Sequence, residues 1–261
     1  GEVGDEMKIK TFIVGGYLRD AILGRKLKDI DIMVEKNVFE FSKKLSKKLG
    51  VNKTVEFEKF QTVKIPYKEC EIEVANSRAE TYDKSSRKPE TVKPTSVEDD
   101  LIRRDFTINA MAASINPSTF GELIDSFNGL KDLNNGIIKT PTDPDSTFID
   151  DPLRMLRAIR FAAQLDFKVD TDIKESIKNN RDRITIVSQE RITAEIIKIL
   201  KTNKPSISFY LLKELNFLGL IFPELDIMSG VDVINNMGHK DVFIHTLEVV
   251  DNAAKLSKKM E

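Results

Sequence analysis

Residues 12–34 read FIVGGYLRDAILGRKLKDIDIMV, and this stretch decides the fold that we predict for the chain. It opens with a short apolar run of strand type that ends at a pair of glycines. Residues 17–23 then have helical spacing, and Gly24 can end the helix because glycine adopts positive φ without strain. In residues 30–34 apolar and polar side chains alternate, as in a strand with one buried face. We therefore expect a strand, a tight turn, a helix and a second strand.

The second strand carries two carboxylates on one side. Asp29 and Asp31 are two residues apart, so they point to the same face at a spacing of roughly 7 Å. Mg²⁺ prefers oxygen ligands, and two such ions ~3.5–4 Å apart would stabilise the attacking and leaving oxygens of a phosphoryl displacement. The N–H groups of Gly15 and Gly16 could receive a triphosphate at the helix N-terminus, and Arg19 could add a charged contact. Taken alone, these features could be a solvated strand edge and a plain turn; together they favour a nucleotide site.

The run GGYLRDAILG followed by KDIDIMV resembles the opening motif of class II tRNA nucleotidyltransferases, the CCA-adding enzymes, and of the related bacterial poly(A) polymerases. The resemblance extends over residues 12–200, through motifs that stand in the family's order. It implies an α+β fold with a polymerase β-like nucleotidyltransferase head and a mixed sheet over residues 1–140. An all-helical neck that recognises the nucleobase would occupy 141–204, and the start of a helical body or a truncated HD-like region would occupy 205–261.

Composition is that of a globular chain without a membrane segment. Its 261 residues are 40% hydrophobic and 32% charged, enough for one large domain or two smaller ones. No apolar run approaches the ~20 residues that span a bilayer, no signal peptide is recognised, and Cys70 is the only cysteine. We therefore expect a soluble cytoplasmic protein with no membrane partner. The net charge of −1 argues against a uniformly basic surface, but residues 36–48 carry five lysines against one glutamate, enough for a few phosphate contacts.

Regular patterns continue after the opening stretch. Residues 38–49 predict an amphipathic helix, and the alternating stretches 55–67 and 69–78 predict antiparallel strands. The family has a strand glutamate followed five residues later by an arginine, and this chain has Glu73 and Arg78. The resemblance therefore makes Glu73 a candidate third active-site carboxylate, with an exposed strand glutamate as the alternative.

A polar stretch leads to a second motif. Residues 79–99 are polar and aperiodic, which predicts a surface loop; it matches the flexible loop that the family needs for adding the terminal A, and a plain linker is the alternative. Residues 99–115 read DDLIRRDFTINAMAASI and predict a helix with Asp105 and Asn109 four apart on one side. Such a pair could bind a ribose hydroxyl and so select RNA, and Arg104 could bind a phosphate or the ribose. The run RRDFTINAMA is close to the family's second motif, against the alternative of a charged helix surface.

Residues 150–167 read DDPLRMLRAIRFAAQLDF and form the second functional stretch. Asp151 and Arg154 are three apart, so they project from one face of a first helical turn. A carboxylate accepts from an exocyclic amino group and a guanidinium donates to a ring nitrogen, so the pair suits cytosine and adenine and refuses uracil and guanine. This matches the family's base-reading motif Glu-Asp-x-x-Arg with Asp150 in place of the glutamate, and Arg157, one turn on, is a candidate triphosphate contact. A surface ion pair is the alternative.

The remaining segments predict structure more than chemistry. Residues 120–140 predict a strand, a turn and a strand that finish the sheet, and beyond the prolines that follow no strand pattern appears. His239 and His245 lack the His-Asp dipeptide of an HD metal site. Three charged residues in the helix predicted over 188–200 are interpreted as interhelical struts: Glu190, Arg191 and Glu195.

The resemblance implies attack of a tRNA 3′-hydroxyl on the α-phosphate of CTP or ATP, with release of pyrophosphate and with Mg²⁺ held by Asp29 and Asp31. The expected activity is template-independent addition of C, C and A. A poly(A) polymerase, or an enzyme that adds only CC or only A, is the nearest alternative. A non-catalytic RNA-binding module is a more distant one, and a small-molecule nucleotidyltransferase would have no use for the long helical neck. The oligomeric state is left open.

Overall fold

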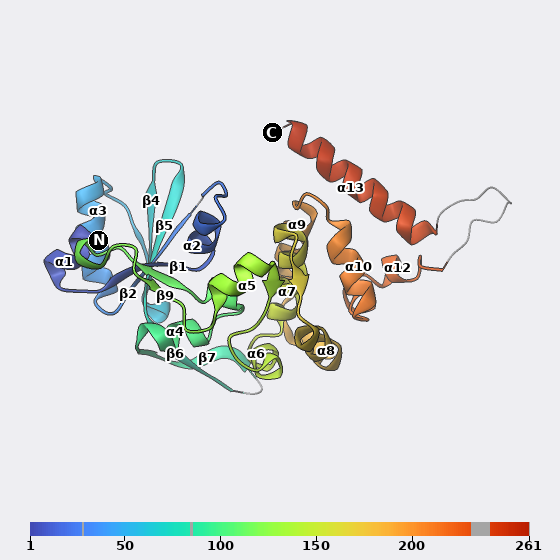
Figure 1. The fold of residues 1–261 in the computed structure, drawn as a ribbon, viewed down its shortest axis with the longest axis horizontal. Coiled ribbons are helices and arrows are strands. Elements are labelled where there is room, and N and C mark those ends of the chain that lie inside the picture. The colour runs from blue at the N-terminus through green and yellow to red at the C-terminus, as the bar shows by residue number, and fades with distance from the viewer. Residues whose placement is uncertain (28, 84–85, 231–240, 261) are drawn as a thin grey trace. The chain divides into compact units, whose positions relative to one another are not determined.

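The computed structural model describes residues 1–27, 29–83, 86–230 and 241–260, with the backbone alone described over 78–83, over 86–94 and at 260 (Figure 1). The chain forms two compact units. The head unit comprises residues 1–135 and 140–142, and the helical unit comprises 136–139 and 143–261.

One mixed sheet is the framework of the head unit. Within the described residues it has the strand order β3-β4-β5-β2-β1-β8-β9. The central strand β2 pairs antiparallel with β1 and parallel with β5, which confirms the α+β fold with a mixed sheet. The strands are β1 (Thr11–Val14), β2 (Ile30–Val34), β3 (Val55–Phe57), β4 (Thr62–Tyr67), β5 (Cys70–Asn76), β8 (Ala112–Ser114) and β9 (Leu123–Ile124).

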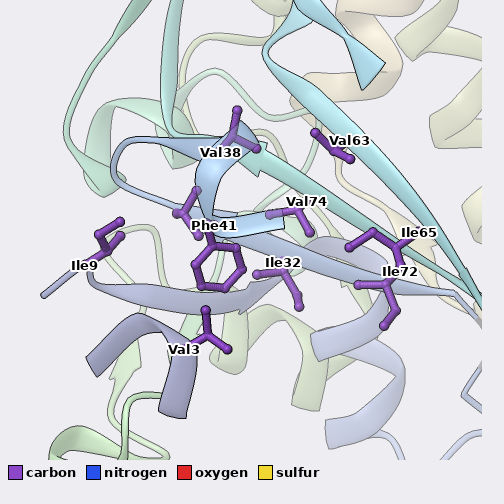
Figure 2. Close-up of a cluster of buried hydrophobic side chains, with 10 residues drawn as sticks. Val3, Ile9, Ile32, Val38, Phe41, Val63, Ile65, Ile72 and Val74 are labelled. Atoms are coloured by element: carbon purple, nitrogen blue, oxygen red, sulfur yellow. The ribbon is translucent and has the colours of Figure 1, made fainter. Parts of the chain in front are cut away.

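Helices cover the sheet where its strands carry apolar side chains. The helices of the head unit are α1 (Glu2–Met7), α2 (Gly15–Ile22), α3 (Val38–Leu49), α4 (Val97–Ile102) and α5 (Gly129–Asn135). On one face α1 and α3 pack on the strands, and Figure 2 shows Phe41 of α3 between Val3 of α1 and Ile32 and Val74 of the sheet. Phe41 is 1% exposed, so its replacement by alanine would cost ~3–5 kcal/mol of stability.

The opposite face of the sheet carries the predicted carboxylates. Phe12 and Met33 point to this face and pack with Leu101 of α4. Side chains two residues apart on a strand share a face, so Asp31 leaves β2 on the same side as Met33. Glu73 of β5 is its register partner. The opening stretch therefore folds as predicted: β1, a glycine turn, α2 and β2.

The helix predicted over residues 99–115 is wrong beyond its first turns. α4 ends at Ile102, a 3₁₀ turn covers Thr107–Asn109, and Ala112–Ser114 form β8. β8 pairs antiparallel with β1, so the alanine-rich end of the segment becomes a strand through long-range pairing that overrides its helical preference.

Two further segments differ from their predicted form. The predicted loop over 79–99 contains the strands β6 (Arg78–Asp83) and β7 (Ser86–Pro94), which pair antiparallel. In the stretch predicted as strand, turn and strand, α5 follows β9 instead of a turn, because both oxygens of Asp125 accept from the backbone N–H groups of Gly129 and Leu130.

The helical unit begins with a short parallel ladder and continues as helices. β10 (Ile137–Ile138) pairs with β11 (Lys168–Val169), a two-residue strand that the pattern did not predict. The helices are α6 (Pro144–Asp150), α7 (Leu153–Leu165), α8 (Thr171–Asn180), the 3₁₀ helix η4 (Arg181–Ile186), α9 (Gln189–Leu200), α10 (Ser206–Glu214), α11 (Leu218–Ile221), α12 (Pro223–Asp226) and α13 (Val242–Met260). Among the described residues, no helix combines the length and the apolar character that crossing a membrane requires.

Candidate active site

Two carboxylates from neighbouring strands line one hollow of the head unit. Asp31 and Glu73 are register partners on β2 and β5, and the hollow, about 210 Å³ in volume, is also lined by Arg103 and Arg104. Burial raises the pKa of the Asp31 carboxyl to about 6; the charges of Glu73 and Asp29 also raise it, and that of Arg104 lowers it. The site therefore concentrates negative charge beside two guanidinium groups.

Asp29 lies immediately before β2 and is exposed. Its Oδ1 atom accepts a hydrogen bond of 3.0 Å from the backbone N–H of Glu71. On the next strand, the Nζ atom of Lys64 lies 2.6 Å from Oε1 of Glu71 and 3.7 Å from Oε2 of Glu73. Across the described ranges, no group of three or more His, Cys, Asp or Glu side chains is arranged to hold a metal ion. The three predicted carboxylates are thus neighbours, while Asp29 and Glu73 interact with other partners.

A buried aspartate fixes the guanidinium groups. Asp100, which is 2% exposed, accepts from Arg103 through Oδ1 at 2.7 Å and from Nε and Nη2 of Arg104 through Oδ2 at 3.1 and 3.0 Å. Burial alone would raise the pKa of Asp100, but the charges of Arg104 and Arg103 outweigh it and hold the pKa below the ordinary value. Asp100 therefore stays ionised and holds Arg104 in a two-point contact.

The turn at Gly15 lies next to both the guanidinium of Arg104 and the carboxylate of Asp31. Gly15 has φ +65°, and a Cβ at this position would lie 3.1 Å from Nη1 of Arg104 and 3.4 Å from Oδ2 of Asp31. The left-handed backbone conformation strains residues with a side chain, and a Cβ would stand in tight contact with the Arg104 guanidinium. Glycine at this position therefore brings bare backbone to the point where the carboxylate and the guanidinium meet. A Cβ at Gly16 would lie 3.5 Å from Nη2 of Arg19.

Three predicted nucleotide contacts form one buried network. The Nη1 atom of Arg19 donates to Oδ1 of Asn109 at 2.8 Å, and Nδ2 of Asn109 donates to Oδ1 of Asp105 at 2.9 Å. All three side chains are buried, Arg19 to 4% exposure. The predicted proximity of Asp105 and Asn109 is present, although a 3₁₀ turn and not an α-helix creates it. The network ties α2 to the second motif.

In the helical unit, the predicted base reader has a partner that the sequence did not indicate. The carboxylate of Asp151 accepts from Nη2 of Arg191 at 2.8 Å and from Nη1 at 3.2 Å, a two-point contact across 40 residues of sequence. Its Oδ1 atom also accepts from the backbone N–H of Leu153 at 3.2 Å, at the start of α7, where Arg154 follows. Burial raises the pKa of the neighbouring Asp150, and the charge of Arg154 opposes this.

One turn further, Arg157 lies beside a buried ion pair. Glu195 of α9 accepts from Nε of Arg160 at 2.6 Å and from Nζ of Lys198 at 2.8 Å, and Nη1 of Arg157 is 3.9 Å from its Oε1. Burial would raise the pKa of Glu195, but Arg160 and the other cations lower it. Because Arg160 belongs to α7 and Glu195 to α9, the interpretation of Glu195 as an interhelical strut is confirmed. The guanidinium of Arg157 lies 5.5 Å from the centre of the Phe161 ring.

Three residues that shape these sites are not among the predicted site residues: Lys64, Asp100 and Arg103. Arg191, which the sequence predicts as an interhelical strut, is in addition the partner of Asp151. Lys64 and Arg191 reach their partners through strand register and helix packing, for which local spacing gives no signal. Asp100 pairs with Arg103 and Arg104, three and four residues further along the chain. His245 lies on α13, and His239 lies outside the described residues.

Comparison with known proteins agrees with this geometry. Residues 11–139 match the poly A polymerase head domain, and residues 166–228 match the probable RNA and SrmB-binding site of polymerase A. The chain therefore belongs to the family of poly(A) polymerase-type tRNA nucleotidyltransferases.

Individual relatives carry more specific names. The chain is 44% identical over 170 residues to an A-adding tRNA nucleotidyltransferase of Aquifex aeolicus (strain VF5), a match that covers 65% of this chain and 20% of the relative. It is 38% identical over 201 residues to the CCA-adding enzyme of Ligilactobacillus salivarius (strain UCC118), with 77% of this chain and 48% of that enzyme covered. The chain thus spans half the length of these curated relatives or less.

A solved structure supports the fold over most of the chain. A tRNA nucleotidyltransferase complexed with a primer tRNA and an incoming ATP analogue aligns with a TM-score of 0.75 and 34% identity. The alignment covers 87% of this chain and 65% of that one.

Proposed function

We propose that this chain carries the catalytic head and the base-recognising neck of a tRNA nucleotidyltransferase that adds C, C and A to the tRNA 3′ end from CTP and ATP. The observation that carries the proposal is the hollow in which Asp31 and Glu73 lie with Arg103 and Arg104. A triphosphate joined to a divalent cation needs both charge types at once, carboxylates for the metal and guanidinium groups for the phosphates. The names of the relatives, and the complex of one solved structure with tRNA and an ATP analogue, support the substrate classes.

The carboxylates fit a resident Mg²⁺. Their donors are all oxygen atoms. Burial, followed by the charges of Glu73 and Asp29, raises the pKa of Asp31, and a bound cation would offset these effects. Asp29 and Asp31 would hold the ion with Glu73 beside them, and the bound ion would supply charge stabilisation to the phosphoryl oxygens.

The chain's own residues would do the rest by positioning. Asp100 fixes Arg104 through Nε and Nη2, so Nη1 is directed to the Gly15 turn, where a phosphate oxygen would be neutralised. The buried network of Arg19, Asn109 and Asp105 would keep the second motif in place behind this contact. Most of the rate enhancement in phosphoryl transfer comes from such preorganised charge.

Asp151 and Arg154 would read the nucleobase in the helical unit. The two-point contact from Arg191 fixes the plane of the Asp151 carboxylate. An ionised carboxylate only accepts hydrogen bonds, so it would receive the amino group of cytosine or adenine and repel the carbonyl oxygen of uracil or guanine. Addition would then need no nucleic-acid template.

The test uses tRNA that ends before its CCA, incubated with each labelled nucleoside triphosphate alone and with all four together. We expect incorporation of two C residues and one A, followed by a stop, and no incorporation of U or G. The double variant Asp29→Ala, Asp31→Ala is the inactive control. The full-length CCA-adding enzyme of Ligilactobacillus salivarius, of which the match covers 48%, is the positive control. Absent incorporation, with the double variant binding tRNA as well as the unaltered chain, would instead favour an RNA-binding module.

Addition of A alone is the second candidate, because the relative with 44% identity is named as an A-adding enzyme. In that case tRNA ending in CC would accept one A from ATP, and tRNA lacking all three residues would accept nothing. Long A tails on either substrate would point to a poly(A) polymerase.

A further inference from the structure

Lys64 lies in the same cross-strand row as the predicted metal-binding carboxylates. Asp31 of β2 is the register partner of Glu73 of β5, and Glu73 is the register partner of Lys64 of β4. Register partners on adjacent strands project from the same face, so the ammonium group stands beside the carboxylates and not beside the apolar core under α3. Its side chain is 36% exposed, so part of it is withdrawn from water.

The ammonium group of Lys64 already interacts with one of these carboxylates, Glu73, and more closely with Glu71 on the same strand. Its Nζ atom lies 2.6 Å from Oε1 of Glu71 and 3.7 Å from Oε2 of Glu73, while the Oδ1 atom of Asp29 accepts from the Glu71 backbone. In this arrangement the described residues contain no set of three metal-ligating side chains with the geometry to hold an ion. Glu73 would have to share its charge with Lys64, or leave it, in order to serve a metal.

We propose that Lys64 is an internal counter-ion that competes with the divalent cation for the carboxylates of this site. The proposal rests on the proposed metal-dependent function. An ammonium group carries one positive charge and a divalent cation carries two, so the ion displaces Lys64 from Glu73 only against their mutual repulsion. Lys64 would hold the carboxylates together without a metal and set the affinity with which the metal enters.

The magnitude follows from charge and distance. A single positive charge one strand away from a bound divalent ion repels that ion. In water-like surroundings and at moderate salt, this repulsion weakens the binding of the ion about three- to tenfold. Lys64→Met removes the charge and keeps most of the side-chain length. We therefore expect Lys64→Met to bind a divalent cation about three- to tenfold more tightly than the unaltered chain.

The experiment measures metal binding to the substrate-free chain, with Mn²⁺ followed by electron paramagnetic resonance and Mg²⁺ by calorimetry. Lys64→Arg keeps the charge and should bind within about twofold of the unaltered chain. Lys10→Met is the matched control, because Lys10 also pairs with a carboxylate, Glu35 at 3.3 Å, next to the end of β1 remote from Gly15. This control should leave the affinity unchanged, and circular dichroism should show all variants folded.

Three results would overturn the proposal: unchanged or weaker binding in Lys64→Met, equal tightening in Lys10→Met, or no binding in any variant. Lys64→Gln provides a second test if the Met variant does not fold. Because no turnover is measured, the outcome is separate from that of the incorporation assay. Tighter metal binding without nucleotide incorporation would leave the counter-ion role standing and remove the proposed function.

Discussion

Replacement of Asp31 by asparagine should stabilise the head unit while removing its activity. In the folded chain the pKa of Asp31 is about 6, against an ordinary value of 3.8. A carboxyl group with a raised pKa binds its proton more tightly in the folded state than in the unfolded state. The free energy of unfolding is therefore highest at low pH and falls as the pH rises from about 4 to about 6. Above that window the ionised group lowers the stability by a constant amount.

The size of the effect follows from the two pKa values. At about 1.36 kcal/mol for each tenfold change in proton affinity, the difference corresponds to roughly 3 kcal/mol. Asp31 keeps some contact with solvent, and screening reduces this to about 1–2 kcal/mol. Asp31→Asn carries no charge and escapes the loss, so its midpoint of thermal unfolding at pH 7.5 should lie about 3–6 °C above that of the unaltered chain.

The assay is thermal and urea unfolding of both chains at pH 4 and pH 7.5, with and without Mg²⁺. The two chains should be equally stable at pH 4, and Asp31→Asn should be the more stable at pH 7.5. Mg²⁺ should raise the stability of the unaltered chain and have less effect on the variant, because an ion that binds only the folded state stabilises it by mass action. A variant that is less stable at pH 7.5, or a difference that does not change with pH, would refute the reasoning.

Three further substitutions test other contacts. Gly15→Ala should cost about 1–3 kcal/mol of stability, measured by urea unfolding, and most of the activity, since φ is +65° and the new Cβ meets two charged groups. Arg191→Met should leave Asp151 without its two-point contact and raise incorporation of U and G relative to C and A in the labelled-nucleotide assay. Glu195→Gln should destabilise the helical unit by about 3–5 kcal/mol, because it removes the negative charge from a buried ion pair with Arg160. Since the pKa of Glu195 is lowered, its contribution should already be lost in the unaltered chain as the pH falls through that pKa.

Each of these outcomes can fail in a distinct way. Full activity of Gly15→Ala would mean that the turn has no close neighbour during turnover. Unchanged nucleotide selection in Arg191→Met would remove Asp151 from base reading. Equal stability of Glu195→Gln and the unaltered chain, above pH 6, would show that the ion pair is not needed between α7 and α9.

The parts of the fold that the sequence predicts are those set by local rules. Residues 12–34 combine a glycine turn, one helix with an end signal and a strand with strict alternation, and each feature is decided within a few residues. Residues 112–114 are different, because they form β8 by pairing with β1, about a hundred residues away, and with β9. Nothing in their alanine-rich composition favours a strand, and the helix predicted there fails for that reason.

The candidate site divides in the same way. Asp29 and Asp31 could be selected from their spacing, whereas Glu73 was selected by resemblance alone, and the structure places it by register. Lys64 could not be selected as a partner of Glu73, because their contact depends on the alignment of β4 with β5. Asp100 stands three and four residues before Arg103 and Arg104, but the spacing does not show that its carboxylate is buried. Spacing identifies side chains with useful chemistry, and tertiary pairing decides which of them meet.

The ladder of β10 and β11 limits how the chain can be divided into fragments. A cut after residue 140 would leave Ile137–Ile138 on the wrong piece and deprive Lys168–Val169 of its only described backbone partner strand. Ile138 is fully buried, so the cut would expose its apolar side chain on one fragment. Both fragments would keep backbone amide groups that have lost their hydrogen-bond partners in the ladder. A cut after Asn135 keeps both strands together, and an independently expressed helical unit should therefore begin at Gly136.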